Sequence, residues 1–521
     1  MMINTTISRI NKILLTILSI FIILEIIFYP STENIYGSFV LALSFYVTQR
    51  LVFTYENIKK HFISFFILFS YTFCFSFMPF LATLLNKSPL IYKFEVPYLT
   101  FNYHFLFQIS LICAFLIAKK IGKKRNIVRS FLLKHTNYFN PLQPKIIYWL
   151  GVIGIVALFS AKMFRGEGII SKISGGSFFL IACPLVLLFP HLYTRTYIPP
   201  FTKSSNKMVW LFVICSFLIG IAANSRSTMF FMVLMIFLLY LTQQLIFNKT
   251  SIFLSWKKLL PILFLCFIIT GPLTDLASAV VLVRNQRTDL SPTELFSQTL
   301  NLYRNKEVLY KIQKEYEQIH STYAENNKEG WSEEYTGNIF LDRFCNLRVS
   351  DATLYYAKHL GFNNPEMRKN FYNNLLSILP TPILNIFGIN SQIKEVIEYS
   401  GGDKLYSLAM KDSHALGGFR VCGYTGIGLA TFGHFFFLIV IFVYTIIFYL
   451  VDSLILPLSN KNTIIPIGTL IQLYSFFYFL NNGDGITRNI TFLIRGFIQS
   501  ILIYLLVVWL IQRFFISNKI A

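Results

Sequence analysis

The chain has 521 residues, of which 55% are hydrophobic and only 13% are charged, and its mean hydropathy is +0.57. Soluble domains carry about 25% charged residues, so this composition excludes an ordinary soluble protein and predicts an integral membrane protein. The net charge of +22 does not predict a nucleic-acid partner, because the surplus of basic residues comes from loops between apolar segments and forms no single stripe.

Twelve apolar segments predict membrane-spanning helices, since a helix needs about 20 residues to cross a bilayer. The first segment follows Arg9 and Lys12 and has no small-residue cleavage site behind it, so we expect it to be retained as a helix. The sequence therefore predicts an all-α polytopic membrane protein, with nine helices in residues 1–283 and three in residues 416–521. The predicted spans are residues 13–29, 35–53, 62–85, 101–118, 146–161, 177–194, 208–223, 228–247, 259–283, 426–451, 463–481 and 490–510.

Between the ninth and tenth spans lies a long polar segment, residues 284–415, which we call the island. It holds 15 basic and 16 acidic residues, whereas the rest of the chain holds 31 basic and 8 acidic ones. Loops of this length are seldom mere connectors. The island is therefore expected to carry recognition or chemistry.

The basic residues also predict the orientation in the membrane. With the N-terminus placed inside, 22 basic residues outside the island fall on the inner side, including the cluster from Lys119 to Arg125, and 9 fall on the outer side or within helices. Loops rich in Lys and Arg stay in the cytoplasm, so both termini are predicted to be cytoplasmic and the island extracytoplasmic. No internal repeat and no matched pair of broken segments is evident, and secondary transporters often show both.

The island itself has the signals of a folded helical cap. Residues Ser291 to Glu294 form a capping box with proline at the first helical position. Leu309, Ile312, Tyr316 and Ile319 repeat with helical spacing. Asn364-Pro365 is expected to start a further helix that ends near Pro380 and Pro382, and Gly401-Gly402 is expected to end another.

Several arginines stand where a charge is costly, at the predicted outer ends of spans. A cation at the centre of a bilayer costs roughly 2.5–3.5 kcal/mol, so such residues usually face a cavity or a partner. A cluster of guanidinium groups would suit a phosphate or pyrophosphate, which it binds bidentately; the alternative is that the side chains snorkel to lipid headgroups. These arginines are Arg226, Arg284, Arg287, Arg420 and Arg488, with Arg495 inside the last span.

His414 is a candidate general base. It follows Asp412 just before the glycine-rich segment Gly417 to Gly423, at the predicted boundary between water and membrane. An imidazole can take a proton from a sugar hydroxyl, and Asp412 could orient it. The alternative is an ordinary surface histidine with a charged neighbour.

Three stretches resemble Wzy-type polymerases, the membrane enzymes that polymerise the repeat units of bacterial O-antigen or capsule. They are Ala222 to Ser227 at the start of an apolar helix, Arg343 to Asp351 in the island, and Gly417 to Gly433 before an aromatic-rich helix. About a dozen spans and a large outer loop late in the chain also fit. The stretch after Pro380-Thr381-Pro382 lacks the basic, tryptophan-containing sequence seen in many relatives.

The resemblance implies a glycosyltransferase of the C type in the bacterial inner (plasma) membrane. Such an enzyme transfers a glycan from undecaprenyl pyrophosphate to a second lipid-linked repeat unit, on the periplasmic face and without a metal or other cofactor. Arg343 and Arg348 then join the arginines above as candidate substrate-binding residues. Membrane lipid and a polysaccharide chain-length regulator are the further implied partners.

Two other functions remain open from the sequence. An O-antigen ligase, or another lipid-linked glycosyltransferase, shares this layout and differs mainly in its acceptor. A flippase or exporter of lipid-linked sugars would also have about a dozen spans, although it needs charged groups along a path reachable from both faces rather than at outer ends.

Overall fold

The computed structural model describes residues 4–122, 126–163, 174–194, 203–223, 225–247, 272–283, 291–312, 331, 335, 341–379, 381–389, 399–458, 463–481, 483 and 485–516. Within these ranges the chain is mostly helical, and seven helices are long and apolar enough to cross a membrane. The predicted class, an all-α membrane protein, is therefore confirmed. The seven helices cover Ile7–Phe28, Phe62–Leu85, Pro97–Gly122, Pro144–Ala161, Thr228–Phe247, Tyr424–Leu454 and Gly485–Phe515.

Local capping sets where several of the first helices begin. The side chains of Ser31, Thr54 and Asn126 each accept a hydrogen bond from the backbone N–H three residues later, which satisfies donors that a helix start leaves unpaired. The elements up to the eighth helix are α1 (Asn4–Phe28), α2 (Thr32–Leu51), α3 (Tyr55–Lys60), α4 (Phe62–Thr72), the π-helical turn η1 (Phe73–Phe77), α5 (Met78–Leu85), α6 (Pro97–Gly122), α7 (Ile127–His135) and α8 (Pro144–Met163).

The middle of the chain is less regular. Prolines 184 and 190 interrupt the next apolar segment, which forms two short 3₁₀ turns around one helical turn. The elements from there to the end of the island are η2 (Phe178–Ala182), α10 (Cys183–Val186), η3 (Pro190–Leu192), α11 (Lys203–Ala222), α12 (Arg226–Phe247), α14 (Pro272–Leu282), α15 (Pro292–Arg304), η6 (Leu341–Phe344), α17 (Leu347–Leu360), α18 (Pro365–Ser377), α19 (Thr381–Ile386), α20 (Gly401–Met410) and η8 (Ser413–Ala415).

The last part of the chain returns to the bundle. Helix α22 packs along α6, and the rings of Phe436 and Phe107 stack with their centroids 6.0 Å apart. The elements are α21 (Tyr424–Phe432), η9 (Gly433–Phe435), α22 (Phe436–Val451), η10 (Asp452–Leu454), the antiparallel strands β1 (Leu456–Pro457) and β2 (Thr463–Ile464), α23 (Ile467–Leu470), α24 (Leu473–Phe477), α25 (Gly485–Thr491), the π-helical turn η11 (Phe492–Gly496), α26 (Phe497–Ile511) and η12 (Gln512–Ile516).

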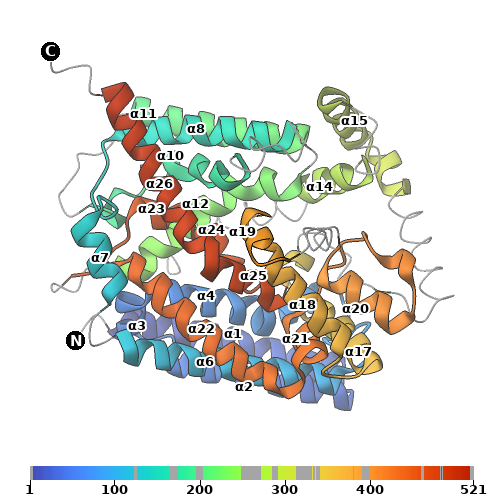
Figure 1. Cartoon of the computed structure of the whole chain (residues 1–521). Coiled ribbons are helices and arrows are strands. Elements are labelled where there is room, and N and C mark those ends of the chain that lie inside the picture. The colour runs from blue at the N-terminus through green and yellow to red at the C-terminus, as the bar shows by residue number, and fades with distance from the viewer. Residues whose placement is uncertain are drawn as a thin grey trace.

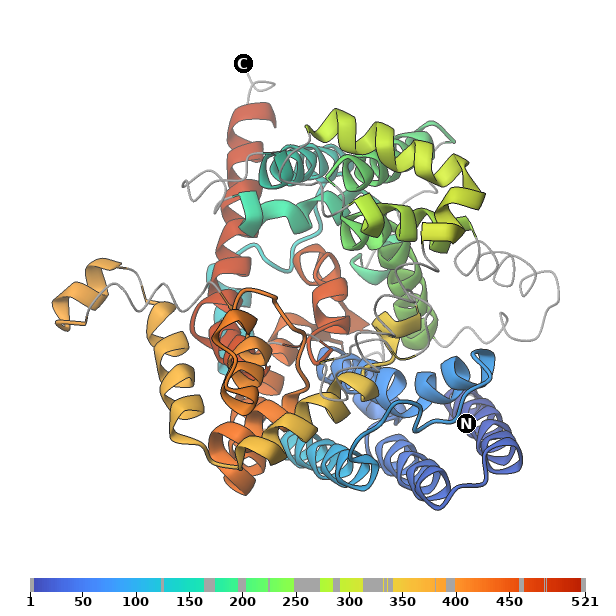
Figure 2. The same cartoon turned by 90° about the vertical axis from the view of Figure 1, so that its right-hand side faces the viewer.

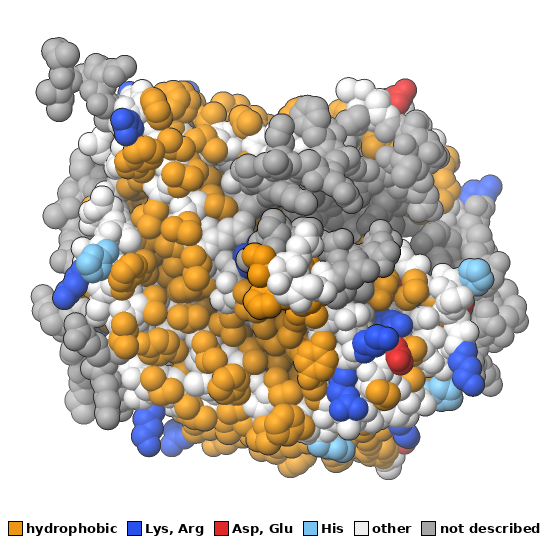
Figure 3. Space-filling model, viewed as in Figure 1, with side chains coloured by type: hydrophobic (Ala, Val, Ile, Leu, Met, Phe, Trp, Pro, Cys, Tyr) orange, Lys and Arg blue, Asp and Glu red, His pale blue; other side chains and the backbone are white. Residues whose placement is uncertain are grey.

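The arrangement separates the chain ends from the island. In Figure 1 the long helices α6 and α8 run from left to right, both chain ends lie at the left, and the island helices α15, α17, α18 and α20 lie at the right. We call the right-hand side the island end. Figure 3 shows a broad band of hydrophobic side chains between basic groups at the left edge and a more mixed, charged region at the right. This is the surface expected of a protein embedded in a bilayer.

Two predicted spans are not continuous helices. Segment 177–194 is broken by the prolines described above, and segment 463–481 starts in strand β2 and continues through the short helices α23 and α24, which follow Pro466. The two broken segments touch, because the N–H of Ile465 donates to the carbonyl of Leu192 over 2.9 Å. Proline content alone did not reveal how these two segments fold or that they touch.

In the island, two predicted helix starts are confirmed and one predicted helix end is wrong. Ser291 and Glu294 form the predicted capping box at α15, and Asn364 caps α18 as expected. Gly401 and Gly402, however, begin helix α20 instead of ending a helix. The reason is that Ser400 and Asp403 form a second capping box, which fixes a helix start at this point. The helical repeat predicted beyond Ile312 lies outside the described residues.

A reporter-fusion experiment tests the orientation. An alkaline phosphatase fused after Lys123 should be inactive, because the basic cluster keeps that loop in the cytoplasm, whereas one fused after Lys328 should be active. Western blots of both fusions control for expression. An active fusion at Lys123 together with an inactive one at Lys328 would reverse the orientation.

Candidate functional site

Segments far apart in the sequence meet where the island joins the bundle. Helix α17 packs against α21 and α20. A methyl group placed on Gly423 would lie 2.7 Å from Cα of Ser350, so only glycine allows this approach. The N–H of Gly423 donates to Oγ1 of Thr353 over 2.8 Å, and the N–H of Cys422 donates to the carbonyl of Gly483 over 3.2 Å. We call this junction of α17, the segment before α21 and the turn before α25 the seam.

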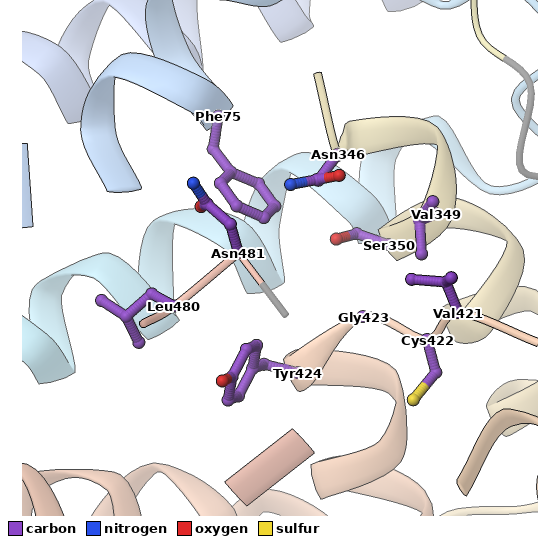
Figure 4. Close-up of a pocket in the computed structure, with 10 residues that line it drawn as sticks. All are labelled: Phe75, Asn346, Val349, Ser350, Val421, Cys422, Gly423, Tyr424, Leu480 and Asn481. Carbon is purple, nitrogen blue, oxygen red and sulfur yellow. The ribbon is translucent and has the colours of Figure 1, made fainter. Parts of the chain in front are cut away.

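A cavity of about 10 Å³ lies in the seam, roughly the space that one water molecule needs. Figure 4 shows Tyr424 and Asn481 on one side of it and Asn346 and Ser350 on the other. Among the described residues, Nδ2 of Asn346 and Oδ1 of Asn481 are buried without a hydrogen-bond partner. The cavity is too small for a sugar, so these groups suit a bound water and a packing role.

Asp403 organises the loop that leads into the seam. Its carboxylate accepts hydrogen bonds from the N–H groups of Ser400 (3.1 Å), Phe419 (2.8 Å) and Arg420 (3.1 Å). It also forms an ion pair of 3.0 Å with Nη1 of Arg420. Phe419 has a positive φ of 52°, which is uncommon for a residue other than glycine. A single buried carboxylate thus holds the loop in an otherwise unfavourable shape.

The pKa of Asp403 reports the balance at this carboxylate. Burial has the largest individual effect and raises the pKa, but the hydrogen bonds from Arg420, Ser400 and Phe419 together outweigh burial, so that the pKa lies below its usual value. The group is therefore ionised at neutral pH, as an ion pair with Arg420 requires.

Arg420 is held on several sides. Its Nη1 also donates to the carbonyl of Ala415 over 2.5 Å, and its guanidinium carbon lies 4.4 Å from the ring centroid of Tyr406, within the range of a cation–π contact. The side chain still has 24% of its surface exposed. Among the described residues no acceptor pairs with its Nε or Nη2. Those groups are free to meet an anion while Asp403 fixes the orientation of the side chain.

Arg348 behaves differently from the other arginines. It is only 4% exposed and donates from Nη1 to Asp351 over 2.9 Å. The carboxylate of Asp351 also accepts from the N–H groups of Glu95 and Val96 and from Oγ1 of Thr100. Asp351 thereby caps the start of α6 and ties the island to the bundle. Arg348 is thus engaged in an internal ion pair and is not presented to a substrate.

The pKa of Asp351 is raised, because it is almost fully buried. The hydrogen bonds from Glu95, Thr100 and Val96 and the charge of Arg348 oppose this effect. Burying such a carboxyl group costs desolvation free energy, which its contacts with Arg348 and the start of α6 offset. Its role in the structure is to dock α17.

His414 and Asp412 lie in the turn η8, which follows α20. His414 is exposed, and the carboxylate of Asp412 accepts from its backbone N–H over 2.9 Å. Asp412 therefore shapes the turn through the backbone rather than through the imidazole ring. The carbonyl of Ala415, next along the chain, contacts Arg420. The structure thus brings the candidate base and Arg420 to the same loop.

The remaining predicted arginines are spread over the island end. Helix α12 begins at Arg226, and its neighbours there are α11, α14 and α15, whereas Arg420 stands among α17, α20 and α21. The side chains of Arg226 and Arg343 lie outside the described part of the structure, as do Arg284 and Arg287 altogether. Arg488 is exposed on α25.

A larger cavity, of about 260 Å³, lies beside the first turns of α12. Its walls come from α8, the broken segment around residues 175–181, α12 and α24, and they are mostly apolar, with no charged residue among the described ones that line it. The rings of Phe178, Phe231 and Tyr474 line it in a chain of edge contacts at 6.0 and 4.9 Å between centroids. Such a cavity between membrane helices suits a hydrocarbon chain rather than a sugar.

Sequence reasoning missed Asp351, Asp403 and Tyr424. The pair Ser400 and Asp403 has the spacing of a capping box, so Asp403 could have been found from the sequence, although its ion pair with Arg420 could not. The contact of Asp351 with Arg348 has the local i,i+3 spacing of a helical ion pair, but its other three donors lie more than 250 residues away and left no signal in the sequence.

Comparisons with known proteins add no family to this picture: no protein-family model, no curated protein and no solved structure matches the chain.

Proposed function

We propose that the chain is a polymerase that joins lipid-linked oligosaccharide repeat units into O-antigen or capsular polysaccharide. It would act on the periplasmic face of the bacterial inner membrane, with both termini in the cytoplasm. The observation that carries the proposal is the seam. Two of the three stretches that resemble such polymerases, Arg343 to Asp351 and Gly417 to Gly433, pack against each other there although they are far apart in sequence.

In the proposed reaction, a hydroxyl of the acceptor sugar attacks the anomeric carbon of the donor glycan. The bond from that carbon to the undecaprenyl pyrophosphate breaks, and the pyrophosphate leaves with the electron pair. His414 takes the proton from the hydroxyl. Arginines stabilise the charge that develops on the leaving pyrophosphate, in the place that a metal ion takes in other glycosyltransferases.

The arginines divide between two places in this proposal. Arg226 stands at the start of α12, next to the apolar cavity, so a lipid pyrophosphate bound there would place its isoprenoid chain between α8, α12 and α24. Arg420, with two N–H-bearing nitrogens unpaired among the described residues, lies on the loop of His414 and would contact the reacting sugars or the pyrophosphate from the island side.

Deleting the gene and separating the surface polysaccharide on a gel tests this function. Loss of a polymerase should leave lipid A–core that carries a single repeat unit. Loss of a ligase leaves bare core and lipid-linked polymer instead. Loss of a flippase leaves neither polymer nor capped core, and complementation by the intact gene controls for polar effects.

A flippase or exporter of lipid-linked sugars is the second candidate. The observation in its favour is the contact between the two broken segments, 177–194 and 463–481, because transporters often bind their substrate where discontinuous helices meet. A flippase needs charged groups along its path, however, and none of the described residues that line the neighbouring cavity is charged.

A further inference from the structure

An uncharged stretch stands out in the island. Residues 371–393 contain no Lys, Arg, Asp or Glu over 23 positions, although the island as a whole is rich in both signs. The stretch covers more than half of α18 and all of α19. Neither the proposed chemistry nor the seam uses these residues.

The base of this stretch is attached to the body of the protein. Met367 and Asn370 of α18 are buried, and the ring of Phe371 meets that of Phe432 edge-on at 4.8 Å. From this base α18 leads away, and Figure 2 shows α18 and α19 standing out sideways from the bundle. We call residues 371–389 the arm.

The tip of the arm presents apolar side chains to its surroundings. Ile386 is 80% exposed and Phe387 is 69% exposed, and Tyr372 nearer the base is 57% exposed. Large apolar side chains gathered at a projecting tip are unusual for a surface in water. We therefore expect lipid or another protein surface to cover these side chains.

The position of the tip along the bundle indicates that lipid covers these side chains. In Figure 1, α19 does not continue toward the island end beyond α17 and α20 but falls back to the level of α25. Helix α25 is the first part of the membrane-crossing helix Gly485–Phe515. In Figure 3 the hydrophobic side chains in this region adjoin the apolar band. The tip is therefore at the depth of the lipid-facing surface.

The arm is built to enter a membrane without crossing it. Helix α18 has 13 residues and α19 has 6, with Pro380 and Pro382 near the join and Gly388 at a φ of 66° after the second helix. Neither helix reaches the roughly 20 residues of a span, and the proline and glycine positions turn the chain back. Tyrosine side chains such as that of Tyr372 favour the zone between headgroups and acyl chains, and phenylalanines such as Phe387 are typical of the apolar face that an interfacial helix buries in the bilayer.

We propose that the tip of the arm, around Ile386 and Phe387, inserts into the leaflet of the bilayer on the island side and anchors the island to the lipid surface. Such an anchor does not require the proposed polymerase activity. The arm would hold α18, and with it the α21 surface on which α18 packs, at a fixed height above the lipid. Its partner is the phospholipid leaflet itself.

Fluorescence quenching on the full chain in phospholipid nanodiscs tests this insertion. A bimane label attached to Phe387→Cys should be quenched by phospholipid carrying a nitroxide near its headgroup, and should lose little fluorescence to iodide in the water. The same label on Ser413→Cys, an exposed position in η8, should show the reverse. The unsubstituted chain gives the background from native cysteines, and Ile386→Cys provides a second position if the first variant does not fold.

Two results would overturn the proposal. Quenching by iodide at position 387 as strong as at position 413 would place the arm in water. Protection from both quenchers would mean that protein covers the tip. A second copy of the chain would then be the cover if the unlabelled Phe387→Cys variant formed disulfide-linked dimers that the unsubstituted chain does not form.

Discussion

An alanine at position 414 should abolish glycan extension while leaving the protein and its lipid-linked repeat units present. In the proposed mechanism the imidazole takes the proton from the acceptor hydroxyl, and such base catalysis is typically worth about 10²–10⁴-fold. A loss of that size removes the polymer ladder from a gel. His414 is exposed and contributes little to the fold, so the variant should express like the parent protein.

The neighbouring carboxylate gives a second test of the same prediction. Asp412→Ala should cause a smaller loss, because Asp412 supports the backbone of the turn. A full ladder from His414→Ala cells would remove the histidine from the mechanism.

Replacing Asp403 with asparagine should also reduce glycan extension strongly, because it removes the carboxylate that holds the loop of Arg420 in place. Removing one member of a buried ion pair costs about 3–5 kcal/mol, and the partial exposure of Arg420 points to the lower end of that range. The loop from Gly417 to Arg420 should then open. Hydrogen exchange of its amides should rise, most of all at Phe419 and Arg420, and extension should fall strongly.

Two further variants sharpen this prediction. Arg420→Lys keeps the charge but loses the guanidinium group, which donates to both Asp403 and Ala415 and stacks on Tyr406; it should reduce polymer at unchanged protein level. Glu366→Gln, at the exposed start of α18, is the matched acidic control and should behave like the parent. Near-normal polymer and unchanged exchange in Asp403→Asn would show that the loop does not depend on the carboxylate.

The pH dependence of this loop follows from the lowered pKa of Asp403. A carboxyl group whose pKa is lower in the folded state adds stability above its ordinary pKa, and this stability is lost as the pH falls through the lowered value. The protection of the Phe419 and Arg420 amides, measured relative to their intrinsic exchange rates at each pH, should thus stay high at neutral pH and fall only in acid. In Asp403→Asn this protection should be low at both.

The sequence predicted the membrane class, the positions of the long apolar helices and two of the helix caps, because apolar length and capping residues are local signals. It did not predict the broken segments or the start of α20. It located the loop of His414 and Arg420 correctly at a span end, but not the pairing of Arg420 with Asp403 or of Arg348 with Asp351. The pairing of Arg420 with Asp403 depends on how separate segments pack, whereas Arg348 and Asp351 have the i,i+3 spacing of an ion pair within one helix, a local signal that the sequence interpretation did not use.

Arg348 shows the consequence for the candidate site. From the sequence it resembles the other arginines, whereas in the structure it is buried in an ion pair that docks α17 on α6. Arg420 has a similar partner but keeps part of its guanidinium exposed. Burial, rather than residue type, therefore distinguishes Arg348, which has a structural role, from Arg420, which remains a candidate substrate-binding residue.

The central claim is that this chain alone joins lipid-linked repeat units, and purified protein tests it most directly. The full chain is reconstituted in liposomes with undecaprenyl-pyrophosphate-linked repeat units as the sole substrate, and products are separated by length. We expect glycans of two and more repeat units together with released undecaprenyl pyrophosphate, and neither product from His414→Ala. Repeat units that stay single, or that cross the bilayer without being joined, would contradict the account.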